Sequence, residues 1–126
     1  MASELRVNTL KDAAGNNSVA MQYVANGSAK VTILFNQEGT LANLYSFGVS
    51  SISDGGTGKT TVSFTNSFNS ANYTPTGMGG ENGSLAQTRT QNIGTMASGS
   101  SLILGHLTSG LEDLERMGAT YFGDLA

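Results

Sequence analysis

Apolar and polar side chains alternate over several short runs of this chain, and turn-forming residues separate the runs. The alternation is clearest in residues 30–35, where Val31, Ile33 and Phe35 share one face. A period of two residues, rich in β-branched and aromatic side chains, predicts half-buried β-strands. The same pattern predicts strands near residues 5–10, 19–24, 45–52, 61–65, 101–107 and 119–122, a weak strand or loop at 41–45, and a strand at 85–93 that is polar on both faces and is expected at an edge or subunit contact.

Residues 45–68 are predicted to form a hairpin around a glycine-rich turn at residues 53–59. The Asp-Gly and Gly-Gly pairs of this turn supply the positive φ angles that tight or bulged hairpin loops need. Ile52 falls out of phase with Phe47 and Val49, which predicts a β-bulge before the turn.

The turn contains Gly58-Lys59-Thr60, which resembles the end of a phosphate-binding loop. The full motif needs a glycine where this chain has Ser53, and it needs a helix directly after the lysine. The residues after Lys59 have a strand pattern instead. We therefore predict an exposed lysine in a hairpin turn and no nucleotide site.

Helical spacing occurs late in the chain, at Leu107, Leu111 and Leu114. Ser109 and Glu112 fit a capping box at the start of such a helix. This pattern predicts a single helical turn there, or an irregular loop in its place.

Short strands separated by glycine and asparagine turns predict an all-β fold, an antiparallel β-sandwich of the jelly-roll-like or Ig-like type. Helix is expected only near Ser109 to Arg116. We divide the chain into residues 1–28, an extended N-terminal arm for attachment or oligomerisation, and residues 29–126, the sandwich domain. Two short strands in the arm cannot bury a core alone. They need the rest of the domain or the same arm in other subunits.

The arm carries more apolar side chains than a solvated peptide would keep. Only 12% of all residues are charged, against roughly 25% in an average domain. A surface of Ser, Thr, Asn and Gly can be covered by partner subunits, so we expect an obligate homo-oligomer. The residues assigned to oligomer or docking contacts are Leu5, Val7, Leu10, Val19, Met21 and Tyr23.

Composition also argues against several classes of partner. A net charge of −3 without clusters of Lys and Arg predicts no nucleic-acid partner. No apolar run approaches the ~20 residues of a membrane span, so no membrane insertion is expected. The N-terminus lacks a basic and then apolar signal peptide, which predicts synthesis in the cytoplasm.

Candidate catalytic and metal-binding residues are sparse. The chain has no cysteine and a single histidine, His106, which lies in phase with Leu102 and Leu104 on a predicted strand. A zinc or nucleophilic site would need companions for it. The acidic cluster of Glu112, Asp113 and Glu115 is expected to face solvent rather than to form a glycosidase pair or a calcium loop. We expect no enzyme, no cofactor and no metal site.

Several low-complexity blocks follow one another along the chain. They are Ser3 to Ser18, Asn26 to Lys30 with the strand ending at Phe35-Asn36, Ser46 to Gly58, Thr61 to Thr65, and Phe122 to Ala126. Taken in this order, the blocks resemble small structural proteins of tailed bacteriophages, especially of the cyanophage type. Residues 79–117 match no part of that pattern. The resemblance implies a virion component, usually a homotrimer, with an N-terminal arm that attaches and a β domain that projects.

The resemblance thus implies a non-enzymatic, short trimeric tail-fibre-like protein, made in the host cytoplasm and located in the virion. Its expected partners are itself, other virion proteins of the tail or capsid, and a glycan of the host surface. Two alternatives stay open: a head decoration (cement) protein that stabilises the capsid, and a glycan-binding adhesion module. For ligand contact, Tyr73 in its polar loop is the first candidate and Tyr121 the second.

Overall fold

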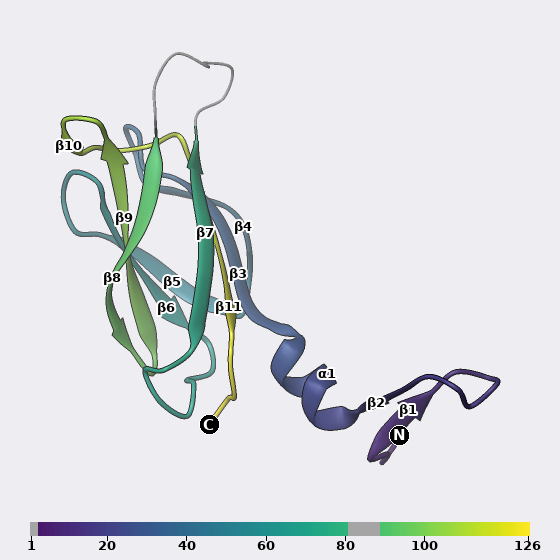
Figure 1. Ribbon diagram of the computed structural model, residues 1–126. Helices are drawn as coiled ribbons and strands as arrows, with labels where there is room; N and C mark the ends of the chain where they lie inside the picture. Colours follow the sequence, from purple (N-terminus) through teal and green to yellow (C-terminus); the bar gives the residue numbers. More distant parts are fainter. Residues whose placement is uncertain (1–2, 81–88) are drawn as a thin grey trace.

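The computed structural model describes residues 3–80 and 89–126 (Figure 1). These residues form mostly β-structure in antiparallel sheets, with one short helix, as the alternating pattern predicted. The elements are β1 (Thr9–Lys11), β2 (Ser18–Ala20), α1 (Met21–Gly27), β3 (Ala29–Asn36), β4 (Ala42–Phe47), β5 (Val49–Asp54), β6 (Lys59–Phe64), β7 (Thr74–Gly80), β8 (Thr90–Ala97), β9 (Ser100–Leu107), β10 (Gly110–Leu111) and β11 (Arg116–Phe122).

One sheet has four strands in the order β4-β3-β11-β7. The predicted face of β3 is confirmed, because Val31, Ile33 and Phe35 are all buried. In β11, Met117, Ala119 and Tyr121 are buried in the same alternating way, and the strand predicted at 119–122 is therefore present. The opposite face of this sheet carries the partly or fully exposed residues of each strand.

The second sheet has five strands in the order β10-β9-β6-β5, with β8 paired to the free side of β9. Val62 and Phe64 of β6 and Ile103 of β9 are buried, so the strands predicted at 61–65 and 101–107 are confirmed. The prediction of a polar edge strand holds for its described part, because among residues 3–80 and 89–126 β8 pairs with β9 alone. The remainder of that prediction, residues 85–88, lies outside the described residues.

Gly48 divides the predicted first strand of the central hairpin between the two sheets. Phe47 ends β4 in the first sheet, and Val49 begins β5 in the second. Gly48 has a φ of 71°, and a Cβ atom there would lie 2.5 Å from the carbonyl oxygen of Lys30. Such a turn requires glycine. The predicted bulge is confirmed by the register shift between Val49 and Ser51.

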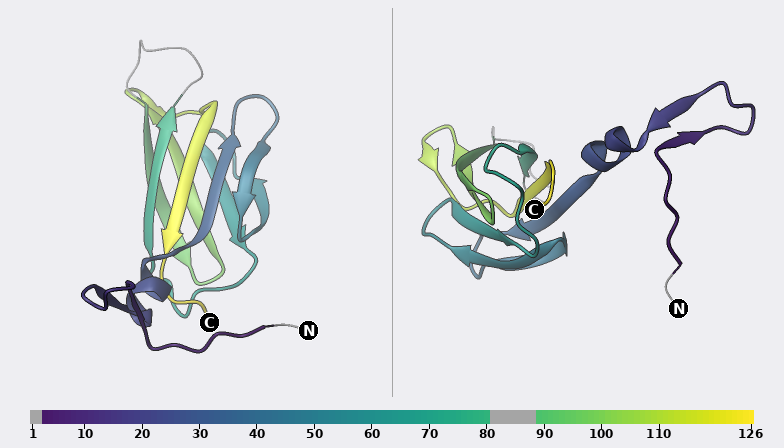
Figure 2. Two further views of the ribbon diagram at one scale, coloured as in Figure 1. Left: turned by 90° about the vertical axis from the view of Figure 1, so that its right-hand side faces the viewer. Right: turned by 90° about the horizontal axis from the view of Figure 1, so that it is seen from below.

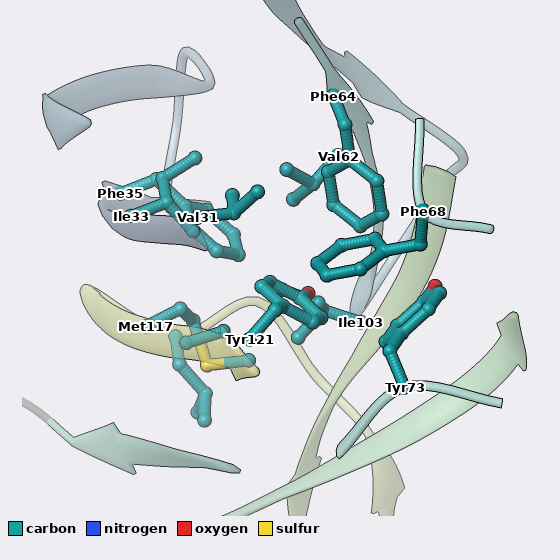
Figure 3. Packing of buried hydrophobic residues seen from close by; sticks show 12 residues of the cluster. Val31, Ile33, Phe35, Val62, Phe64, Phe68, Tyr73, Ile103, Met117 and Tyr121 are labelled. Atoms are coloured by element: carbon teal, nitrogen blue, oxygen red, sulfur yellow. The ribbon is translucent and has the colours of Figure 1, made fainter. Parts of the chain in front are cut away.

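Buried side chains of both sheets meet in one core (Figure 3). Aromatic rings form its centre: Phe64 contacts Phe68, Tyr73 and Tyr121 edge to face, with ring centroids 5.1–5.6 Å apart. Phe68 and Tyr73 stack at 4.5 Å. Aromatic pairs in such geometries stabilise a core beyond the area that they bury.

A buried glutamine joins the two sheets near the end of β3. Gln37 Nε2 donates a hydrogen bond to the Thr60 hydroxyl of β6 at 3.0 Å, and its Oε1 accepts one from the Leu114 N–H at 3.2 Å. The Gln37 N–H also donates to the Leu114 carbonyl at 2.9 Å. These bonds satisfy polar groups that burial would otherwise penalise.

Helix lies in a different place from the one that the sequence predicted. Of the two alternatives near Ser109 to Arg116, the helical turn is wrong and the irregular loop is present at residues 112–115. Leu114 is buried there and its backbone bonds to Gln37, while the Glu112 N–H donates to the Gly105 carbonyl. The strand predicted at 19–24 is wrong beyond Ala20. α1 begins at Met21, and its end is closed by the Ser28 N–H and hydroxyl, which both donate to the Val24 carbonyl.

The N-terminal segment, residues 3–28, consists of an irregular leader (residues 3–8), the β1–β2 hairpin and α1. The predicted strand at 5–10 is reduced to β1, and the structure does not show the extended arm that the sequence predicted. Hydrogen bonds hold the segment to itself, for example from the Met21 N–H to the Asn8 carbonyl at 2.9 Å. Figure 2 (right) draws the hairpin and leader beyond α1, away from the two sheets.

Candidate functional site

The N-terminal segment leaves most of its apolar side chains in water. Leu5 is 81% exposed and Tyr23 68%, and Val7, Leu10 and Val19 are also exposed. None of the buried core residues of the described chain belongs to this segment. Five of the six residues that the sequence assigned to contacts are thus uncovered, and the sixth, Met21, is half-buried.

A second uncovered apolar surface is the outer face of the sheet β4-β3-β11-β7. Figure 2 (left) turns this sheet toward the viewer, and no described segment crosses in front of it. Tyr45 and Phe47 of β4 and Met78 of β7 are 61%, 60% and 79% exposed. The register places Tyr45 beside Leu34, Leu34 beside Gly118, and Gly118 beside Met78 in one row across the sheet.

The outer face is hollowed along β11, where Gly118 has no side chain. One open hollow of about 450 Å³ is lined by Gly118, Met78 and threonines of the neighbouring strands, including Thr32 and Thr76. A second hollow of about 260 Å³ is lined by Gly118, Met78, Leu34 and Arg116, among others. Both hollows are lined by Gly118 and Met78 and therefore lie next to each other on the sheet; together they are named the Gly118 groove.

Charge on this face is sparse and of one sign. The strands β3, β4, β7 and β11 contain no Asp or Glu, and their only charged residues are Lys30 and Arg116. Lys30 donates to the Ala25 carbonyl of α1. Aromatic residues, methionine and arginine are enriched in protein interfaces, whereas acidic residues are depleted, so the composition of this face is typical of an interface.

The two tyrosines proposed for ligand contact lie in the core instead. Tyr73 is 6% exposed and its hydroxyl donates to the Ser100 carbonyl at 2.8 Å, while Tyr121 is fully buried. Burial raises the pKa of both phenols, that of Tyr121 to about 12. The expectation that Tyr73 is exposed in a polar loop is wrong because its ring stacks on Phe68. Its burial removes the basis for a ligand contact.

The exposed aromatic residues that the sequence interpretation missed are Tyr45 and Phe47. Both point outward from β4. Residues 41–45 had been expected to form only a weak strand or loop, and Phe47 had been assigned to the first strand of the central hairpin. Their spacing of two residues in a run without charge was the available signal. Met78 had no signal of its own, because a single methionine between glycines has no period.

The remaining candidate groups have structural surroundings. His106 is half-buried on β9, opposite Leu111 of β10 and Thr90 of β8. Asp113 Oδ1 accepts a hydrogen bond of 2.6 Å from the Gly58 N–H. Within residues 3–80 and 89–126, no group of three or more His, Cys, Asp or Glu side chains could hold a metal ion.

Lys59 begins β6 and its side chain is exposed, as predicted for a hairpin turn. A strand follows the lysine, so the helix of a phosphate-binding loop is absent at this position. Among the described residues, no helix has the length and apolar character needed to cross a membrane.

A comparison of the chain with models of protein families, with curated proteins and with solved structures finds no match. The function is therefore proposed from the residues and their geometry.

Proposed function

We propose that this protein is a non-enzymatic structural component of a bacteriophage virion, a short trimeric tail-fibre-like protein attached through residues 1–28. The observation that carries this proposal is the N-terminal segment, whose large apolar side chains are exposed although the segment is folded. The virion and the number three come from the resemblance of the sequence blocks to small phage structural proteins.

Burial of the exposed groups supplies the energy for attachment. Each large apolar side chain contributes roughly 1.5–3 kcal/mol when fully buried. Leu5, Leu10 and Tyr23 are at least 42% exposed and can gain much of that amount. Ordering a backbone costs about 1–2 kcal/mol per residue. Since the hairpin and α1 already have their own hydrogen bonds, docking has less left to order.

The β domain, residues 29–126, is proposed to be a β-sandwich that projects from the attachment point. Both sheets contribute side chains to one core, which supports a sandwich. In Figure 3, Val62 and Ile103 of one sheet face Val31 and Tyr121 of the other. The jelly-roll-like or Ig-like type of this sandwich stays a prediction. The N-terminal segment would act as the arm, with its hairpin and helix leading away from β3.

A second candidate function, adhesion to a host-surface glycan, is favoured by one observation. Tyr45 and Phe47 expose two aromatic rings on the same face of β4. Aromatic faces bind the apolar faces of ligands at surfaces. These residues replace Tyr73 and Tyr121 as the candidates for such a contact, and a glycan array with Tyr45→Ser and Phe47→Ser proteins tests it.

The proposed attachment is tested by deleting residues 2–28. We expect the truncated protein to have the mass of a single chain by light scattering and to be missing from purified virus particles. A protein carrying Glu38→Ala, an exposed change in the β domain, serves as the control. A truncated protein that keeps its oligomeric mass and joins the particle would contradict the proposal. Imaging of labelled particles distinguishes a tail location from decoration of the head.

A further inference from the structure

We infer that the Gly118 groove binds the N-terminal leader, residues 3–8, of a second copy of this chain. The inference rests on the proposed function and names the surface that receives the segment. Leader and groove are two of the uncovered apolar surfaces of the described chain, and they lie on different parts of it.

The leader matches the groove in length and spacing. It has no helix or strand of its own, and its six residues reach at most about 20 Å when extended. The seven residues of β11 span about 23 Å. In an extended leader, Leu5 and Val7 point to one side and are about 6.6 Å apart. Alternate residues along β11, such as Gly118 and Thr120, have the same spacing.

The linings of the two hollows favour one orientation. The smaller hollow, which includes Leu34, is suited to Leu5, and the larger hollow, which is lined largely by threonines and glycine, is left for Val7. Because side chains alternate along an extended chain, Glu4 and Arg6 then point away from the sheet and remain in water. Their exposed ion pair contributes little in the free chain, so the contact gains its energy from the apolar groups.

A second copy fits better than the leader of the same chain. Ser28, the only residue between α1 and β3, is extended, and the hairpin lies beyond the helix. Figure 2 (right) accordingly draws the leader far from the sheets. In an assembly of several copies, each leader can cover the groove of a neighbour and remove both exposed surfaces from water.

Cysteine cross-linking tests the contact directly, because the natural chain has no cysteine. A Val7→Cys chain and a tagged Thr76→Cys chain are co-expressed and then oxidised. We expect a disulfide-linked pair that contains one chain of each kind. Val7→Cys with tagged Ser53→Cys, on an exposed position of β5 in the other sheet, is the control and should give none. Equal cross-linking to both positions, or none to Thr76→Cys, would overturn the inference.

Filling the groove provides an independent test that spares the fold. A Cβ atom at Gly118 would have no neighbour closer than 3.8 Å, and the residue has no positive φ. Gly118→Val should therefore leave the melting temperature of the monomeric truncated chain unchanged. In the full chain it should weaken association by about tenfold or more. Ser53→Val adds the same side chain elsewhere and should leave association unchanged.

The outcomes separate this inference from the proposed function. If deletion of residues 2–28 abolishes the oligomer but Gly118→Val does not weaken it, the segment assembles the protein through another surface and the groove assignment is wrong. If the deletion leaves the oligomer intact, the proposed role of the segment itself fails.

Discussion

Tyr73 and Tyr121 place their phenol groups in the same core but with different hydrogen bonding. The Tyr73 hydroxyl donates to the Ser100 carbonyl at 2.8 Å, whereas the Tyr121 hydroxyl makes no well-formed hydrogen bond among the described residues and has only a weaker interaction with the Ser101 hydroxyl. Sequence could place Tyr121 on a closing strand, but it could not foresee the burial of Tyr73. The loop around Tyr73 is polar, and its ring is buried because the nearby Phe64 and Phe68 and the distant Tyr121 of β11 pack against it.

We predict that Tyr73→Phe is more destabilising than Tyr121→Phe. Loss of the bond to Ser100 should lower the free energy of unfolding by about 0.5–1.5 kcal/mol. The Tyr121 hydroxyl is buried with only a weak interaction with Ser101, so its removal should cost less stability than the loss of the Tyr73 hydroxyl. Urea denaturation of both proteins at neutral pH measures the difference, and the reverse order would contradict it.

Tyr121 also makes the stability of the folded protein depend on pH in the alkaline range. Burial raises the pKa of Tyr121 from 10.0 to about 12. The folded protein therefore holds the phenol proton more tightly than the unfolded chain, so the contribution is fully present below pH 10 and is lost as the pH rises toward 12. We expect the unfolding midpoint to fall over this range, and to fall less in Tyr121→Phe. An identical fall in both proteins would exclude Tyr121 as the cause.

At the scale of elements, local pattern predicted individual strands better than their partners. The alternation in β3 and β6 identified Val31 and Val62 as core residues, which the structure confirms. Phe47 and Val49 alternate as though on one strand, because a period of two cannot reveal that the chain changes sheets at Gly48. The helical spacing near Leu111 was misleading because tertiary contacts of Leu114 set the backbone there.

The glycine-rich turn before β6 gives an element-scale prediction from two adjacent residues. Gly58 has a φ of 66°, and a Cβ atom there would lie 2.7 Å from the Gly105 carbonyl oxygen and the Glu112 nitrogen. Gly58→Ala should therefore lower the free energy of unfolding by about 1–3 kcal/mol. Lys59→Ala, at an exposed position, should change it by less than about 0.5 kcal/mol. Chemical denaturation compares the two, and equal effects would argue against the close packing of the turn.

At the scale of the whole molecule, the N-terminal segment and the β domain differ in what they contribute. All residues of the described core lie in residues 29–126, so we expect this part to fold without the segment. The sequence predicted that the segment makes contacts because the segment contains many apolar residues. It could not identify the Gly118 groove, because Leu34, Gly118 and Met78 become neighbours only through the register of three strands.

We predict that the melting temperature of the full chain rises with protein concentration, whereas that of residues 29–126 does not. Association stabilises the folded state by mass action, and only the full chain retains the segment that we propose for it. Differential scanning calorimetry over a hundredfold range of concentration provides the measurement. A truncated chain with the same concentration dependence as the full chain would contradict the assignment.

The central place of β11 also fixes an order of events during synthesis. β11 is made after all the other described strands, yet it lies between β3 and β7 and supplies Met117, Ala119 and Tyr121 to the core. Until it leaves the ribosome, β3 and β7 have no common neighbour, and contacts so distant in sequence form slowly. The apolar faces of β3 and β7 therefore stay exposed in the nascent chain, and the Gly118 groove does not form until β11 is inserted. Unfinished chains would thus offer no receiving groove to their neighbours.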